Sequence, residues 1–200
     1  MRDTSRQLLP RQQRRAQLLR AASVAFAEGG YSATSMDEVA SSAGITKLIV
    51  YRHFESKTEL YRAILDGVAT RLGEEWQSLT SQQHTSGGAT RVLLAVAREH
   101  PDGFRLLFVH AAREPEFAEY RSEFRALQLS AAAEIIDPLI GEPVVRAWAT
   151  SLVVDVVEAS VLRWLEFGEP ERDEEFADRS TDALTALVTS IVVGVHSPPS

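Results

Sequence analysis

The sequence predicts an all-α protein, and three observations carry that prediction. Apolar residues recur every three or four positions along most of the 200-residue chain, which is the repeat of helices with one buried face. No segment combines the strict alternation of a strand with the turn residues of a hairpin. Helix-starting and helix-ending residues divide the apolar pattern into about nine segments.

The composition indicates a chain that folds around a hydrophobic core and has no cysteine. Hydrophobic residues make up 44% of the sequence, enough for a substantial core, and the absence of cysteine excludes disulfides and thiol-based redox sensing. Residues 1–15 hold arginines but no apolar segment of signal-peptide length, and charged side chains interrupt the apolar residues 144–165. We therefore expect a cytoplasmic protein with no membrane partner.

The first third of the chain is expected to form three short helices. The first covers residues 11–28 and ends at a pair of glycines, which readily adopt the left-handed conformation that closes a helix. The second begins at Ser35 and ends near Gly44. Ser35 and Glu38 have the spacing of a capping box, in which each side chain accepts a hydrogen bond from the other residue's backbone N–H. The third covers residues 47–53.

The remaining chain favours six further helices. A second capping box, at Ser56 and Glu59, starts a long helix that continues towards Trp76, and a polar loop follows at residues 78–89. The later helices are expected at residues 90–100, at 101–113 after a proline break, from Phe117 to about Pro138, at 144–167 and at 173–195. The last two are strongly apolar, so an antiparallel pair that doubles into a four-helix bundle across a two-fold axis would bury them.

Residues 36–54 have the pattern of a helix-turn-helix. Ala40 is small where the two helices cross, Gly44 suits the turn between them, and Thr46 opens the second helix. The apolar contacts between the helices would come from Val39, Ala43, Ile45 and Val50. The outward positions of the second helix are Thr46, Lys47, Ile49, Arg52 and His53.

The charge is divided unevenly between the two parts of the chain. The whole sequence has a net charge of -7, yet residues 1–62 hold ten Lys and Arg against six Asp and Glu, a net charge of +4. Residues 63–200 hold eleven against twenty-two, a net charge of -11. A basic module attached to an acidic one fits a protein that binds phosphates with one end only, although ordinary scatter of charges gives the same totals.

The helix-turn-helix segment resembles the amino-terminal domain of the TetR family of transcriptional regulators. The positions that carry the resemblance are Gly30-Tyr31, Thr34-Ser35, Val39-Ala40, Ala43 to Lys47, Tyr51, His53-Phe54, Lys57 and Leu60-Tyr61. It covers about residues 11–71, and beyond them only the helix layout agrees. The resemblance implies a DNA-binding domain at residues 11–71 and a helical effector-binding and dimerisation domain at residues 72–200.

The resemblance also implies roles for individual residues. Thr34 or Ser35, and Thr46, would offer donors to phosphates at helix starts. Lys47 and Ile49 match positions that reach base edges, where a lysine can donate to guanine and an isoleucine can touch a thymine methyl. The residues that match backbone-clamping positions are Tyr51, His53 and Lys57.

Two residues of the recognition helix depart from the family pattern. Leu48 stands where the family often has glycine, and Arg52 occupies a variable position from which it either reads guanine or binds phosphate.

The arginines of residues 1–15 are either an arm for the minor groove or a solvated tail.

The expected partners are an inverted-repeat operator in double-stranded DNA, a second copy of the chain bound through its last two helices, and an unidentified small-molecule effector. Candidate residues of the effector pocket are Phe104, Leu107, Phe108, Phe124, Trp148, Asp155 and Glu158. The two acidic residues could attract a cationic ligand, pair with an arginine across the dimer, or lie at a solvated edge.

The sequence therefore indicates a DNA-binding regulator, a repressor released by its effector, rather than an enzyme. It contains no nucleophile elbow, phosphate-binding loop, dinucleotide glycine motif or paired metal histidines, so we expect no catalytic residue, metal or cofactor. Two alternatives stay open: a helical ligand-binding protein that no longer binds DNA, and a small helical enzyme.

Overall fold

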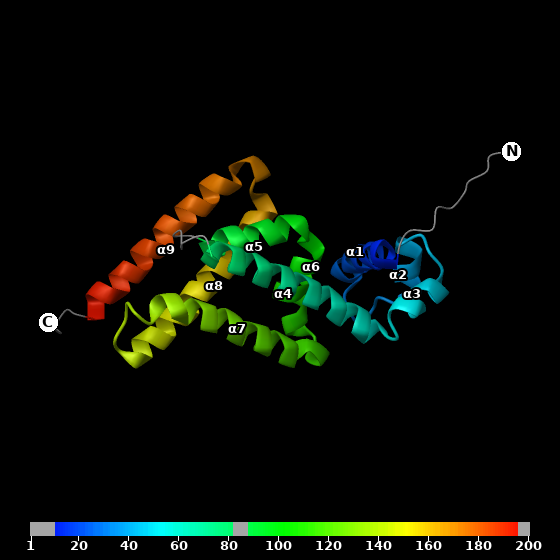
Figure 1. Ribbon diagram of the computed structural model, residues 1–200, viewed down its shortest axis with the longest axis horizontal. Helices are drawn as coiled ribbons and strands as arrows, with labels where there is room; N and C mark the ends of the chain where they lie inside the picture. The colour runs from blue at the N-terminus through cyan, green and yellow to red at the C-terminus, as the bar shows by residue number, and fades with distance from the viewer. Residues whose placement is uncertain (1–10, 82–87, 196–200) are drawn as a thin grey trace.

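The regular structure of the described residues is entirely helical, which confirms the all-α class (Figure 1). The computed structural model describes residues 11–81 and 88–195. Within these ranges nine α-helices follow one another: α1 Arg11–Gly29, α2 Met36–Ser42, α3 Lys47–His53, α4 Lys57–Ser81, α5 Gly88–Glu99, α6 Pro101–Arg105, α7 Ala118–Ile136, α8 Pro143–Phe167 and α9 Asp173–Val195. The centre of the predicted loop at 78–89 and the last five residues of the predicted second domain lie outside the described part.

The predicted helix at residues 101–113 is wrong beyond Arg105. The chain continues there as a π-helical turn, Leu106–His110, and a 3₁₀ turn, Ala111–Arg113, and a second 3₁₀ turn precedes α7. The helix widens where three consecutive apolar residues, Leu106 to Phe108, are all buried. Pro101 occupies the first turn of α6, as expected.

The predicted loop at 78–89 is too long at both ends. α4 continues to Ser81 and α5 already begins at Gly88. No glycine or proline interrupts residues 76–81, and Leu79 packs against the core, so the last turns of α4 are retained.

One of the two predicted capping boxes forms as expected. The Ser35 hydroxyl accepts from the Glu38 backbone N–H, and the Glu38 carboxylate accepts from the Ser35 N–H. At the start of α4 the Ser56 hydroxyl accepts from the Glu59 N–H at 3.0 Å, but the Glu59 carboxylate accepts from the N–H of Glu55 instead of Ser56. The second box is therefore only half formed.

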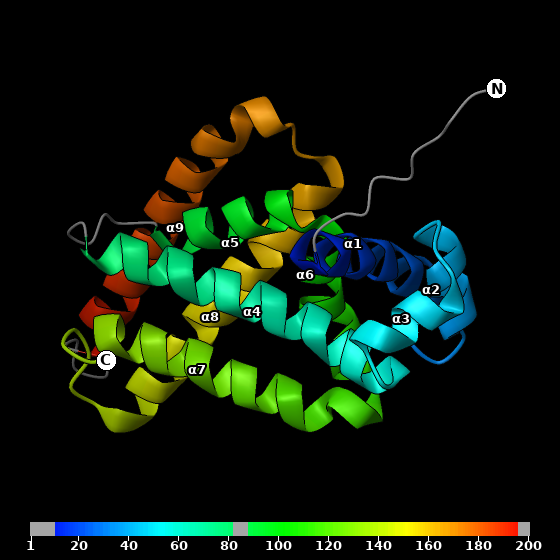
Figure 2. The same ribbon diagram turned by 45° about the vertical axis from the view of Figure 1, so that its right-hand side comes forward.

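The core is continuous from the helix-turn-helix, which we call the head (α1 to α3), into the rest of the molecule, the body. α4 runs from one to the other, and α1 also contacts α6 (Figures 1 and 2). The ring of Phe117, from the body, lies 5.0 Å from that of Tyr31 and 4.5 Å from that of Tyr61. The predicted domain boundary at residues 71 and 72 lies inside α4, and the division stays a prediction.

Helix α9 is fixed at its start to α5 and α8. The Asp173 carboxylate accepts from Arg98 on α5 at 2.9 Å and from the indole N–H of Trp164 on α8 at 2.7 Å. The hydrogen bond from Arg98, aided by Trp164, holds the pKa of Asp173 below its ordinary value despite burial. Trp164 also stacks on Phe176 with ring centroids 4.6 Å apart.

None of the helices in the described ranges has the length and apolar content needed to span a membrane. The apolar residues of α8 instead pack in part against other helices, with Val154, Val157 and Val161 buried.

Candidate nucleic-acid interface and ligand cavity

The turn between α2 and α3 is held by its backbone and by α1. Gly44 has a φ of +64°, its N–H donates to the Ser41 carbonyl, and the Ile45 N–H donates to the Ala40 carbonyl, both at 3.0 Å. The Gln17 side chain of α1 donates to the Ala43 carbonyl at 3.3 Å. The turn therefore fixes how α3 is presented at the end of the molecule, far from the carboxy-terminal helices (Figure 2).

Helix α3 turns Val50 inward and presents a mixed polar and apolar face outward. The exposed residues of this face are Thr46, Lys47, Leu48, Tyr51 and Arg52, with Ile49 and His53 half-buried. Leu48 is 64% exposed, so the residue that departs from the family pattern is available for contact. Thr46 caps α3 without a side-chain hydrogen bond, which leaves its hydroxyl available.

Lys47 is paired with an acidic residue of the neighbouring helix. Its ammonium lies 2.8 Å from the Asp37 carboxylate, and this hydrogen bond raises the pKa of Lys47. Both side chains are more than half exposed, where ion pairs contribute little, so Lys47 can exchange Asp37 for another acceptor at small cost.

The threonine and serine before α2 differ sharply. Thr34 is only 4% exposed and its hydroxyl donates to the Ala25 carbonyl at 3.2 Å, so the expected phosphate contact of this side chain is corrected to a packing role. Ser35 is exposed: its N–H donates to the Glu38 carboxylate and its hydroxyl accepts from the Glu38 N–H, which leaves the hydroxyl hydrogen to donate.

Lys57 holds the connection between α1 and α2. Its ammonium donates to the carbonyls of Tyr31 at 2.8 Å and Ser32 at 3.2 Å, and it lies 4.5 Å from the centroid of the Tyr31 ring. One of its three N–H donors remains for another partner, such as a phosphate.

A basic edge forms where α1 meets the end of α3. Burial, then the positive charges of Arg11, Arg15 and Arg14, lower the pKa of His53. Arg15 also lies over the Phe54 ring at 5.2 Å. These three arginines thus lie on the first helix of the head, within the range predicted for it, while the rest of the basic segment lies outside the described residues.

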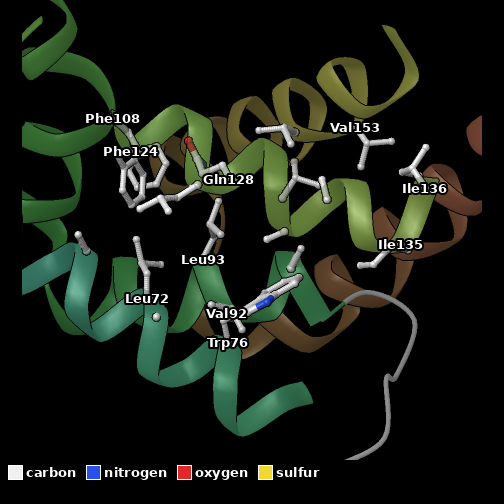
Figure 3. Close-up of a pocket in the computed structure, with 18 residues that line it drawn as sticks. Leu72, Trp76, Val92, Leu93, Phe108, Phe124, Gln128, Ile135, Ile136 and Val153 are labelled. Carbon is white, nitrogen blue, oxygen red and sulfur yellow. The ribbon is translucent and has the colours of Figure 1, made fainter. Parts of the chain in front are cut away.

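The body contains an apolar cavity of about 350 Å³ beside α4 (Figure 3). Its walls come from α4, α5, the π-helical turn, α7 and α8. Phe108 and Phe124, two of the expected pocket residues, line it at one end. Leu127 and Ile135 of α7 also line it and are exposed large apolar side chains.

The other expected pocket residues lie elsewhere. Phe104 and Leu107 are fully buried in the core, and Trp148 is 54% exposed on α8. Asp155 and Glu158 are paired with arginines of α7 instead of facing the cavity. The cavity residues that the sequence did not single out, such as Trp76 and Gln128, lie on helices whose mutual packing is not visible in the sequence.

The head and the cavity present different kinds of surface. No group of three His, Asp or Glu side chains suited to a metal ion occurs in residues 11–81 and 88–195. The head offers exposed donors on a helix, and the cavity offers apolar surface.

Comparison with known proteins finds sequence similarity mainly in the amino-terminal part of the chain and similarity of fold over most of its length. A sequence profile described as "Bacterial regulatory proteins, tetR family" matches residues 18–64. The HTH-type transcriptional activator FasR of Mycolicibacterium smegmatis is 36% identical over 115 residues, which are 55% of this chain and 52% of that protein. The match thus spans about half the length of that curated relative.

Solved structures share the fold over almost the whole chain. A TetR-like transcriptional regulator from Rhodococcus sp. RHA1 has a TM-score of 0.67 at 23% identity, covering 96% of this chain and 100% of that one. AibR in complex with isovaleryl coenzyme A and operator DNA has a TM-score of 0.60 at 21% identity, covering 86% and 97%. The likeness confirms the expected arrangement of an amino-terminal helix-turn-helix followed by a helical body.

The basic edge predicts how His53 titrates. Its pKa should lie below the ordinary 6.5, because burial and the neighbouring arginines disfavour the imidazolium. Arg11→Gln should raise the pKa of His53, whereas the same change at Arg20, farther along α1, should not. Titration of the histidine ring signals by NMR measures both. An unchanged pKa in Arg11→Gln would mean that α1 and α3 do not meet in this way.

Proposed function

Because residues 18–64 belong to the tetR family of bacterial regulatory proteins and the chain has the fold of solved TetR-like regulators, we propose that it is a sequence-specific transcriptional regulator. The observation that carries the proposal is the outward face of α3, held rigidly at one end of the molecule. A helix presented in this way enters the major groove of a duplex. A protein that binds operator DNA acts in the cytoplasm, which we therefore also propose as its location.

The proposed DNA contacts divide into base-reading and backbone-holding residues. Lys47 and Ile49, with Arg52, face the base edges, and exposed Leu48 adds an apolar surface suited to a thymine methyl. Thr46, Ser35, Tyr51, His53 and Lys57 hold phosphates. The arginines at the start of α1 add a sequence-independent attraction.

We also propose a homodimer formed through α8 and α9. An inverted-repeat operator needs two heads related by a two-fold axis. Large apolar side chains are exposed on the two helices, Val144, Trp148 and Phe167 on α8 and Val193 on α9. Isolated exposed residues are ordinary, but a group of this size on adjacent helices favours an interface.

Regulation would follow from the cavity. AibR is described in complex with both a coenzyme A thioester and operator DNA. We propose that this chain is a repressor released from its operator when a small molecule in the cavity favours a spacing of the two heads that no longer fits the DNA. α4 connects the two sites, because it carries cavity residues at one end and packs against the head at the other.

The dimer makes a direct prediction. The mass in solution, measured by light scattering, should be twice 22.1 kDa. Trp148→Glu should shift the protein towards the monomer, because it places a charge in an apolar interface. Leu48→Glu, an equally large change on exposed α3, should remain dimeric. Monomeric wild-type protein, or a Trp148→Glu variant that stays dimeric, would contradict this interface.

Operator binding is tested by selecting duplexes from a random pool with the purified protein. We expect an inverted repeat with half-sites about one helical turn apart and an affinity that falls steeply with salt. Lys47→Ala should weaken discrimination at one base position about tenfold. Arg113→Ala, on the exposed surface of the body, should change neither affinity nor preference.

Two results would contradict the proposed DNA contacts. If no duplex is enriched while the protein remains folded and dimeric, the chain is a ligand-binding protein that no longer reads DNA. If a duplex is enriched and Lys47→Ala binds it with unchanged preference, the reading face is not the one proposed.

A further inference from the structure

The cavity wall is almost free of polar atoms. Of the described side chains that line it, only Gln128 on α7 and Trp76 on α4 carry a nitrogen or oxygen, and none of these described side chains is charged (Figure 3). Trp76 has a single indole N–H, which donates and cannot accept. The polar character of the site therefore depends on which end of the Gln128 amide faces the cavity.

The orientation of Gln128 is fixed by Arg121, about two helical turns earlier on α7. A guanidinium N–H of Arg121 donates to the Gln128 amide oxygen at 3.1 Å. Because a guanidinium has no acceptor, the amide oxygen and not the nitrogen must face it. Among the described residues the Gln128 amide nitrogen has no hydrogen-bond partner of its own. Both polar groups of the described wall thus offer N–H donors, and the amide oxygen of Gln128 is turned towards Arg121.

The charges nearest the cavity cancel each other. Arg121 donates to both carboxylate oxygens of Glu158 at 2.9 and 3.0 Å, and the two side chains are only 13% and 14% exposed. Arg125 pairs with Asp155. The guanidinium of Arg121 also lies within 6 Å of the ring centroids of Phe108 and Phe124, which line the cavity. The charge of Arg121 is therefore compensated by Glu158, and a charged ligand would find no counter-ion among the described residues of the wall.

The cavity is elongated along α7. Its lining residues on this helix extend from Phe124 to Ile136, a length of about 18 Å at the rise of a helix. Gln128 lies near one end, beside Phe124 and Phe108, and the other end is formed by Ile135, Ile136 and Val153 (Figure 3). The volume of about 350 Å³ corresponds to roughly a dozen non-hydrogen atoms at the ~30 Å³ that each water occupies in the liquid.

We propose that the effector is an uncharged, mainly hydrocarbon molecule that carries a hydrogen-bond-accepting oxygen near one end. The oxygen accepts from the Gln128 amide N–H, and the hydrocarbon part extends along α7 towards Ile136. The inference rests on the proposed function only in calling this ligand the effector. It replaces the expectation of a cationic ligand, since Asp155 and Glu158 are neutralised by arginines of their own chain.

Three straight-chain probes of matched length test the ligand class by calorimetry on the full-length protein: methyl decanoate, decanoate and decyltrimethylammonium. The neutral ester should bind at least tenfold more tightly than either ion. Gln128→Leu should weaken ester binding about five- to tenfold, the usual effect of one lost hydrogen bond. Gln13→Leu, the same change on the exposed surface of α1, should have no effect.

A second variant, Ala132→Phe, tests the cavity independently of Gln128→Leu, in case that variant does not fold. Ala132→Phe fills the cavity from the middle of its α7 wall and should abolish binding of all three probes while leaving Arg121 and Glu158 in place. The proposal is overturned if decanoate or the cation binds as tightly as the ester, if no probe binds, or if Gln128→Leu binds the ester like wild type. Operator binding without probes, measured on the same samples, separates this failure from failure of the regulator proposal.

Discussion

The fold depends on one constraint: the buried apolar residues of the head are packed in the same continuous core as those of the body. Tyr31 of the head, Tyr61 of α4 and Phe117 of the body form mutual edge and tilted ring contacts at 4.5 to 5.0 Å. Tyr61 is fully buried, and within the described residues its hydroxyl has no hydrogen-bond partner, so burial raises its pKa. The aromatic packing must offset the cost of that hydroxyl.

This shared core gives α4 its part in the proposed regulation. The first half of the helix contributes Leu60, Tyr61 and Leu65 to the core, and the second half presents Leu72 and Trp76 to the cavity. A ligand against the second half therefore acts on the element that positions the head. The π-helical turn forms a second link, because Phe108 lines the cavity and stacks at 4.2 Å on Phe104 in α6, which contacts α1.

The features that the sequence predicted correctly are mostly those with local causes, although the capping box at Ser56 and Glu59 is only half formed. The Ser35 and Glu38 capping box, the glycine turn and the bounds of α3 depend on residues within a few positions of one another, and each forms as expected. Features decided by distant partners were missed or misplaced. Three such features depend on how the helices pack, which periodicity alone does not determine. They are the burial of the Thr34 side chain, the ion pair of Glu158 with Arg121, and the fact that Phe108 lines the cavity while Phe104 and Leu107 do not.

Amide hydrogen exchange in wild type and Phe117→Ala tests the shared core most directly. Phe117 lies outside the head, and its removal should cost about 3–5 kcal/mol, as for other large core side chains. If head and body share one core, exchange should accelerate by a similar factor in α1, α4 and α7. Acceleration confined to residues after 115, with α1 and α3 protected as in wild type, would show that the head folds independently and would contradict the account.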